Sequence, residues 1–104
     1  MSDVLHYSPQ AQLDLDEILD YFVFGREDAA QGARIVENIL AATERLPGRA
    51  KRYPLVGPLP FTDDAYRFMT VGSYLVFFRV QGEAIFIDRV LYKHRDFASL
   101  LGKA

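Results

Sequence analysis

Hydrophobic residues recur with the period of an α-helix over residues 9–25. Ser8 and Pro9 are typical of a helix start, because serine caps the first free N–H groups and proline fits the first turn. Gly25 marks the end. The residues on the apolar face are Ala11, Leu15, Ile18, Leu19 and Phe22. The pattern predicts an amphipathic helix, preceded by a short strand over residues 4–7.

A second helical pattern follows after a short joint. Asp28, with Gln31 three residues later, resembles a capping box, and Pro47–Gly48 ends the pattern. Its apolar residues are Ile35, Val36, Ile39, Leu40 and Leu46. Two consecutive helices with so short a joint predict an antiparallel helical hairpin.

The composition changes between residues 47 and 65, where four of the five prolines lie. This predicts a long loop without helices or strands, which carries the basic residues Arg49, Lys51 and Arg52. Long loops in small domains often carry function, so the basic residues are candidates for a binding surface.

From Tyr66 the hydrophobic period changes to two. Residues 66–71, 74–80 and 84–91 are rich in aromatic and β-branched side chains, and Gly72–Ser73 and Gln81–Gly82 separate them. They predict a three-stranded antiparallel meander. Strict alternation would place Val90 on the same face as Phe77, and Leu91 on the opposite face with Ile87.

Both faces of this predicted sheet are apolar, whereas two short helices can cover only one of them. The second face could be covered by the proline-rich loop, by the tail after Asp96, by a second copy of the chain or by a separate partner. The fold class predicted for residues 1–104 is α+β, with one domain in which an N-terminal helical hairpin packs on a small, mainly antiparallel β-sheet. The strand over residues 4–7 should lie at an edge of this sheet.

Composition and charge limit the cellular compartment and the kinds of partner to be expected. The chain has 104 residues and no cysteine, which fits a reducing compartment, and it shows neither a signal-peptide pattern nor an apolar run of membrane-spanning length. We therefore expect a cytoplasmic protein. The net charge of −2 hides an asymmetry of −7 over residues 1–44 and +5 over residues 45–104. Such an asymmetry fits either a polyanion-facing surface or pairing of an acidic helix face with a basic loop.

Candidate chemistry is sparse. No metal-site or cofactor-binding motif is present, so we expect no cofactor and no metal. Asp14, Glu17 and Asp20 are interpreted as a solvated helix face without a catalytic role. Residues 89–96 gather arginine, lysine, histidine and tyrosine at a strand end, where they could bind a phosphodiester and move protons without a metal, or contact an acidic protein. His94 alone is typical of an ordinary surface histidine.

The order of elements and several sequence segments resemble the RelE/ParE superfamily of bacterial type II toxin–antitoxin toxins. The resemblance covers nearly the whole chain. Its most specific parts resemble the ParE branch and are Val71–Tyr74, Phe77–Val80, Arg89–Leu91 and Arg95–Asp96. Tyr92 departs from the histidine common in that branch.

The resemblance implies a toxin that is held inactive by a cognate antitoxin in a toxin–antitoxin hetero-oligomer. No membrane partner is expected, because no apolar run is long enough to span a membrane. It also implies one of two activities. ParE-like members inhibit DNA gyrase by binding, and so stop replication and growth, whereas RelE-like members cut mRNA on the ribosome without a metal. A third alternative is a binding module that keeps the fold and has lost the activity.

Sequence details favour the gyrase inhibitor. The RNA-cutting branch has an arginine where this chain has Leu75, and of its two alternate lysines only one is matched, by Arg67, since Met69 stands in the other place. A net charge of −2 also fits poorly with ribosome binding. The chain is therefore expected to act by binding rather than as an enzyme.

Three sets of site residues follow as hypotheses. The residues expected to bind the target are Arg49, Lys51, Arg52, Arg67, Lys93 and Arg95. Those expected to bind the antitoxin are Phe68, Leu75, Phe77 and Phe86. No residue is assigned a catalytic role unless the chain is a ribonuclease, in which case the residues would be Arg67, Tyr92, His94 and Arg95.

Overall fold

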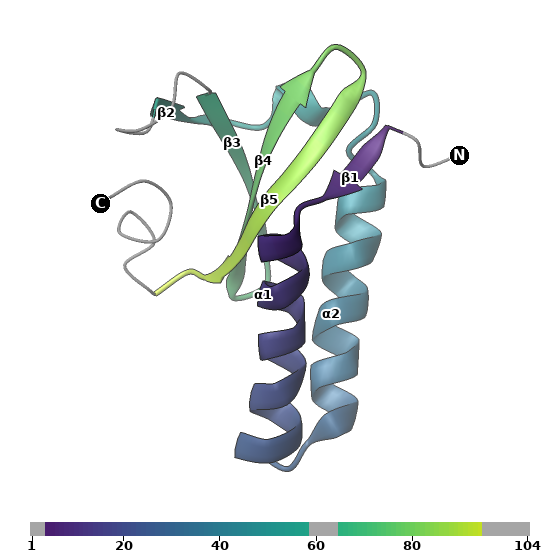
Figure 1. Cartoon of the computed structure of the whole chain (residues 1–104), viewed down its shortest axis with the longest axis vertical. Coiled ribbons are helices and arrows are strands. Elements are labelled where there is room, and N and C mark those ends of the chain that lie inside the picture. The colour runs from purple at the N-terminus through teal and green to yellow at the C-terminus, as the bar shows by residue number, and fades with distance from the viewer. Residues whose placement is uncertain (1–3, 59–64, 95–104) are drawn as a thin grey trace.

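Two helices pack side by side on one face of a five-stranded sheet and extend beyond its end (Figure 1). The computed structural model describes residues 4–58 and 65–94. The elements in chain order are β1 (Leu5–Tyr7), α1 (Pro9–Asp20), the π-helical turn η1 (Tyr21–Gly25), α2 (Ala29–Glu44), the 3-10 turn η2 (Ala50–Arg52), β2 (Leu55–Pro58), β3 (Ala65–Val71), β4 (Tyr74–Gln81) and β5 (Ala84–Tyr92). The predicted α+β class, with a helical hairpin on a small sheet, is confirmed.

The helix starts are where the sequence predicts them. The Ser8 hydroxyl accepts a hydrogen bond from the Ala11 N–H at 2.9 Å and donates one to the Asp88 carbonyl at 2.9 Å, so the cap also ties α1 to β5. At α2, the Asp28 carboxylate accepts from the Gln31 N–H at 3.1 Å. The hairpin is therefore fixed by side-chain caps at the start of each helix.

The two helices approach closely at Gly32, which is buried against Phe22. A Cβ atom placed on Gly32 would lie 2.8 Å from the Phe22 Cβ, which is too close for two carbon atoms. A glycine here allows the hairpin to close, at the cost of some helix propensity.

Substituting Gly32→Ala is therefore expected to destabilise the protein, by about 1–2 kcal/mol after the gain in helix propensity is included. Gly25→Ala is the matched control, because its new Cβ would lie at an ordinary 3.5 Å from the Tyr21 ring. Urea unfolding followed by circular dichroism measures both variants. Equal stability of the two variants would show that the close approach at Gly32 is not a constraint.

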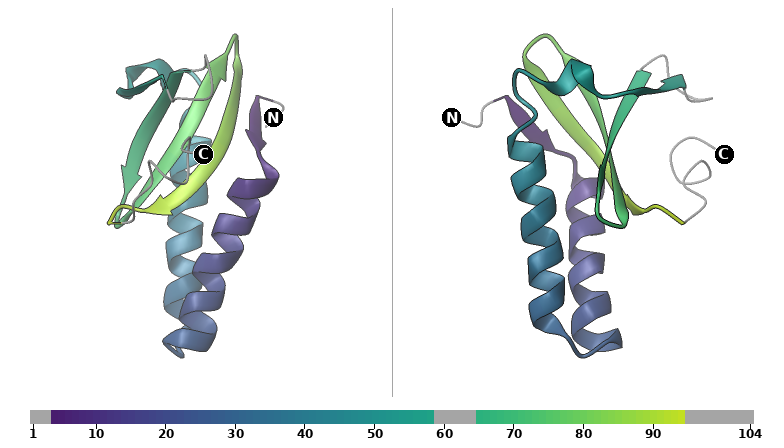
Figure 2. Two further views of the ribbon diagram at one scale, coloured as in Figure 1. Left: turned by 60° about the vertical axis from the view of Figure 1, so that its left-hand side comes forward. Right: turned by 180° about the vertical axis from the view of Figure 1, so that it is seen from behind.

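The sheet has the strand order β1-β5-β4-β3-β2 (Figure 2). The predicted meander of β3, β4 and β5 is confirmed as antiparallel, and β1 lies at an edge, parallel to β5. The prediction of a loop without helices or strands over residues 47–65 is wrong, because η2 forms there and Leu55–Pro58 forms β2, which pairs with β3. Residues 59–64 of that segment lie outside the described residues.

The predicted assignment of β5 side chains to the two faces of the sheet is wrong beyond Asp88, because β5 contains a β-bulge. Phe78 pairs with Ile87 but its neighbour Phe77 pairs with Arg89, so Asp88 is an extra residue without a partner. One extra residue inverts the alternation that follows it. Val90 therefore joins Ile87 in the cluster beneath the helices, and Leu91 is buried outside that cluster.

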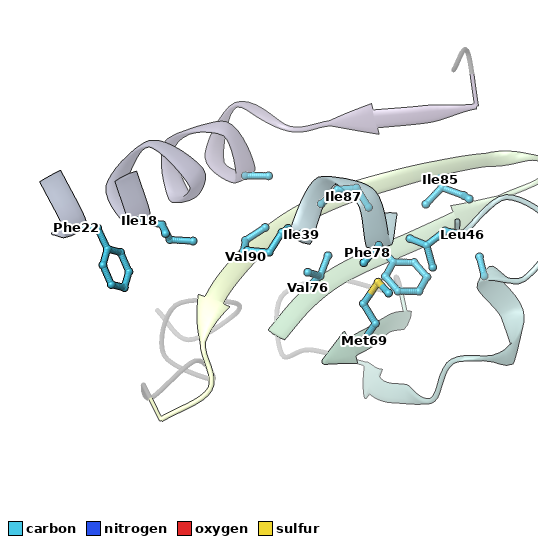
Figure 3. Packing of buried hydrophobic residues seen from close by; sticks show 13 residues of the cluster. Ile18, Phe22, Ile39, Leu46, Met69, Val76, Phe78, Ile85, Ile87 and Val90 are labelled. Carbon is cyan, nitrogen blue, oxygen red and sulfur yellow. The ribbon is translucent and has the colours of Figure 1, made fainter. Parts of the chain in front are cut away.

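The core fills the space between the hairpin and the sheet (Figure 3). The helices contribute Ile18, Phe22 and Ile39, and the strands contribute side chains from both sides of the bulge. The buried strand residues of this cluster are Met69, Val76, Phe78, Ile85, Ile87 and Val90. Phe78 is fully buried and packs edge to face on Tyr53, with 6.0 Å between the ring centroids, which joins the η2 segment to the core.

Candidate functional site

A buried ion pair joins α1 to β5 where the bulge lies. Asp14 is only 6% exposed, and its carboxylate accepts bonds from the Arg89 guanidinium at 2.8 and 2.9 Å and from the Val90 N–H at 2.8 Å. The hydrogen bonds that Arg89 donates to Asp14 raise the pKa of Arg89 above its ordinary value, so this cation stays charged. Because β1 pairs only with residues 85–87, the edge of β5 beyond the end of β1 is not paired with a strand. Asp14 accepts a backbone hydrogen bond from β5 there. The interpretation of Asp14 as part of a solvated face is wrong.

An open groove of about 650 Å³ lies between the projecting part of the hairpin and the far end of the sheet. Its walls include Ile18, Tyr21 and Phe22 from the hairpin, and Tyr74 and Tyr92 from the sheet. Burial raises the pKa of the Tyr74 phenol above 10.0, and the nearby Tyr92 adds to the shift. Tyr74 is therefore a neutral hydrogen-bond donor at physiological pH. The groove offers apolar walls with a few polar atoms.

Sequence reasoning assigns neither Tyr21 nor Tyr74 to a site. A signal existed for Tyr21, because this aromatic residue lies outside the predicted apolar face of its helix and is 53% exposed. Tyr74 gives no such signal, since alternation places it among the core residues of its strand.

The outer face of the sheet, which is the face away from the helices, contains the residues expected to bind an antitoxin. Phe68, Leu75 and Phe86 are partly exposed there, whereas Phe77 is 1% exposed. The Phe86 ring stacks on His6 at 5.1 Å, and the Arg79 guanidinium lies 5.1 Å from the centroid of the same ring. The exposed apolar part of this face is therefore smaller than predicted. Of the predicted covers, the tail after Asp96 and residues 59–64 of the proline-rich loop lie outside the described residues.

The basic residues expected to bind the target are spread over two regions. Arg49, Lys51 and Arg52 are exposed at η2, and Lys93 is exposed after β5. Arg67 lies beside η2, where its guanidinium donates to the Tyr53 carbonyl at 2.7 Å and to the Lys51 carbonyl at 3.2 Å. Arg95 lies outside the described residues. Arg67 therefore holds the η2 segment in place.

The set proposed for a ribonuclease is only partly brought together. Tyr92 and His94 pack on each other, with 5.2 Å between the ring centroids. Arg67 pairs with Phe78, whereas Tyr92 pairs with Tyr74, so the two are four register positions apart, about 13 Å along the strands. Among the described members of the set, the cation and the two rings do not form one site.

Residues 4–58 and 65–94 contain neither a cluster of metal-ligating side chains nor a membrane-spanning helix. No group of three or more histidine and carboxylate side chains in these ranges could hold a metal ion. No helix within the same ranges is long and apolar enough to cross a membrane.

A helical hairpin packed on one face of a small mixed sheet is the α+β arrangement that the resemblance in the sequence implies. The sequence matches the family described as "ParE toxin of type II toxin-antitoxin system, parDE" over residues 5–97, so the chain belongs to the ParE toxin family. A solved structure of the chromosomal ParDE toxin–antitoxin system from P. aeruginosa is similar, with 25% identity and a TM-score of 0.65, covering 85% of this chain and 92% of that chain. No curated protein sequence matches the chain. The family resemblance seen in the sequence is confirmed.

Proposed function

We propose that this ParE-family toxin inhibits DNA gyrase by binding, in the cytoplasm, and is neutralised by a cognate antitoxin. The single observation that carries the proposal is the family match over residues 5–97. The solved relative is a ParDE toxin–antitoxin system, which supports an antitoxin partner for this chain as well. The expected product of neutralisation is a toxin–antitoxin hetero-oligomer.

The geometry supports binding over RNA cleavage. Stabilising a phosphate transition state requires several donors aimed at one point. Arg67 instead directs a guanidinium nitrogen at two backbone carbonyls, and Leu75 places an alkyl side chain on the outer face. A ribosome-dependent mRNA interferase is therefore the weaker candidate.

The outer face is proposed as one contact of the antitoxin. Phe68 and Leu75 are apolar, partly exposed and on adjacent strands, so an apolar partner segment could bury both. Phe86 extends this surface onto β5, and Phe77 packs beneath it, with 6.4 Å between its ring centroid and that of Phe68. The groove beside Tyr74 offers a second apolar surface on the same molecule.

Expression of the chain in bacterial cells tests the target class. We expect growth to stop and a reporter plasmid to lose negative supercoiling while cellular mRNA stays intact. Cleavage of mRNA at codon positions, with normal plasmid supercoiling, would identify an interferase instead. Unimpaired growth would identify a binding module that has lost the activity.

Substituting Phe68→Glu or Leu75→Glu is expected to weaken rescue by the antitoxin encoded next to the toxin gene, because either change puts a charge into the apolar contact. The matched control is Phe24→Glu, at a residue that is 78% exposed in the hairpin turn, far from the outer face. Growth with toxin and antitoxin induced together measures the effect. Full rescue of both outer-face variants would place the antitoxin contact elsewhere.

A further inference from the structure

The described part of the basic half of the chain has its densest positive charge in one short turn. We define the basic turn as residues 45–52, whose cations are Arg45, Arg49, Lys51 and Arg52. All four are exposed, and none makes an ion pair within the part of the chain that the structure describes. Pairing of an acidic helix face with the basic loop, the alternative explanation of the charge asymmetry, is thus not seen among these residues. The acidic and basic halves meet in the Asp14–Arg89 pair instead.

The backbone of the basic turn is held rigidly. Leu46 and Ala50 are buried in the core between the exposed cations, and Gly48 adopts the left-handed conformation, with φ of 82°, that turns the chain after α2. The Arg49 N–H donates to the Leu46 carbonyl at 2.7 Å, and the Arg52 N–H donates to the Arg49 carbonyl at 2.9 Å. The guanidinium of Arg67 donates to the carbonyls of Lys51 and Tyr53. A ligand would therefore meet cations on an ordered scaffold, which lowers the entropy cost of binding.

Among the described residues, the neighbourhood of the basic turn keeps a net positive charge. Arg67 adds a fifth cation, and the described acids that adjoin the turn are Glu44 at the end of α2 and Glu83 in the β4–β5 turn, which lines a hollow with Lys51. The turn of the helical hairpin, which carries Glu27 and Asp28 beside Arg26, lies at the opposite end of the long axis (Figure 2). The molecule is therefore polarised, and a polyanion would approach it from the end that carries η2.

The chemistry of the basic turn favours phosphates over an acidic protein. A protein–protein contact is centred on buried apolar or aromatic anchors, yet the exposed residues of the turn are cations, proline and glycine. Binding to a nucleic-acid backbone needs no apolar centre, and arginine forks match phosphate oxygens. Single-stranded nucleic acid is bound by aromatic stacking, whereas Tyr53, the aromatic residue next to the turn, packs on Phe78.

We propose that the basic turn binds the phosphate backbone of duplex DNA without sequence preference. The inference rests on the proposed function and extends it, because this ParE-family toxin would directly contact the DNA on which its target acts. It does not require gyrase, so the protein alone can be tested.

Fluorescence anisotropy with a short labelled DNA duplex of mixed sequence tests the proposal between about 50 and 200 mM KCl. The wild-type chain should bind with a log–log salt slope of about −3, as expected for three to four phosphate contacts. The double variant Arg49→Gln/Arg52→Gln should bind at least about tenfold more weakly, with a slope smaller by about two. The matched control is Arg26→Gln/Arg34→Gln, which removes the same charge from the helical hairpin.

Several results would overturn the proposal. They are absence of wild-type binding, equal loss in both double variants, binding of single-stranded DNA or an RNA hairpin as tight as that of the duplex, and full competition by polyglutamate. A gyrase supercoiling assay on the same proteins separates the two claims. Inhibition of gyrase without DNA binding would overturn only the proposed DNA contact. DNA binding without inhibition of gyrase would overturn only the proposed target.

Discussion

Replacing Asp14 by alanine is expected to lower the free energy of unfolding by about 3–5 kcal/mol. The carboxylate receives three hydrogen bonds, two from Arg89 and one from the Val90 N–H, at a position that is 6% exposed. Alanine would remove two hydrogen bonds from a partly buried guanidinium and leave the Val90 N–H without its acceptor. The loss exceeds that of a surface ion pair, which contributes at most about 1 kcal/mol.

The matched control for this prediction is Glu17→Ala, an exposed acid one turn further along α1. Urea unfolding should leave the control within about 0.5 kcal/mol of wild type. If the alanine variant fails to fold, Asp14→Asn keeps the shape with a weaker acceptor and should fall between the two. Wild-type stability of both Asp14 variants would show that the buried pair does not hold α1 on β5.

Substituting Phe78→Ala is expected to cost about 3–5 kcal/mol, because a fully buried aromatic ring is removed and a cavity remains. The change also removes the edge-to-face contact that supports Tyr53. The control is Phe68→Ala on the partly exposed outer face, where water can fill the space and the cost should be smaller. Denaturant midpoints at equal m-values measure the difference. Equal costs at the two positions would contradict the assignment of Phe78 to the core.

The elements predicted correctly are those with a strong local signal. Ser8 and Asp28 start the helices by bonds within one turn, and the two glycine turns of the meander adopt positive φ of 60° and 61° at Gly72 and Gly82. The strand over Leu55–Pro58 gives no such signal, since two prolines and a glycine lie in or next to it. It forms because β3 offers a free edge, which local sequence does not encode.

The sequence does not reveal the bulge or the buried acid, for related reasons. An extra residue at Asp88 leaves the apolar alternation regular on either side, so only pairing with β4 reveals it. Asp14 resembles its neighbours Glu17 and Asp20 in type, although its spacing between Ala11 and Ile18 places it on the apolar face. Partners distant in sequence decide both features.

The sequence alone indicates some of the candidate site residues and not others. The basic residues of η2 follow from sequence alone, because a cluster of exposed cations needs no tertiary partner to be recognised. The role of Arg67 in holding that turn depends on two carbonyls brought near by the pairing of β2 with β3. The groove beside Tyr74 depends on how far the hairpin projects beyond the sheet (Figure 1).

Supercoiling of relaxed plasmid by purified gyrase, with the purified chain added, tests the central claim most directly. The account predicts that the toxin at micromolar concentration blocks supercoiling or traps cleaved DNA, and that prior mixing with the antitoxin restores the reaction. Full supercoiling at the same toxin concentration, together with codon-position cleavage of mRNA in a translation reaction, would contradict it.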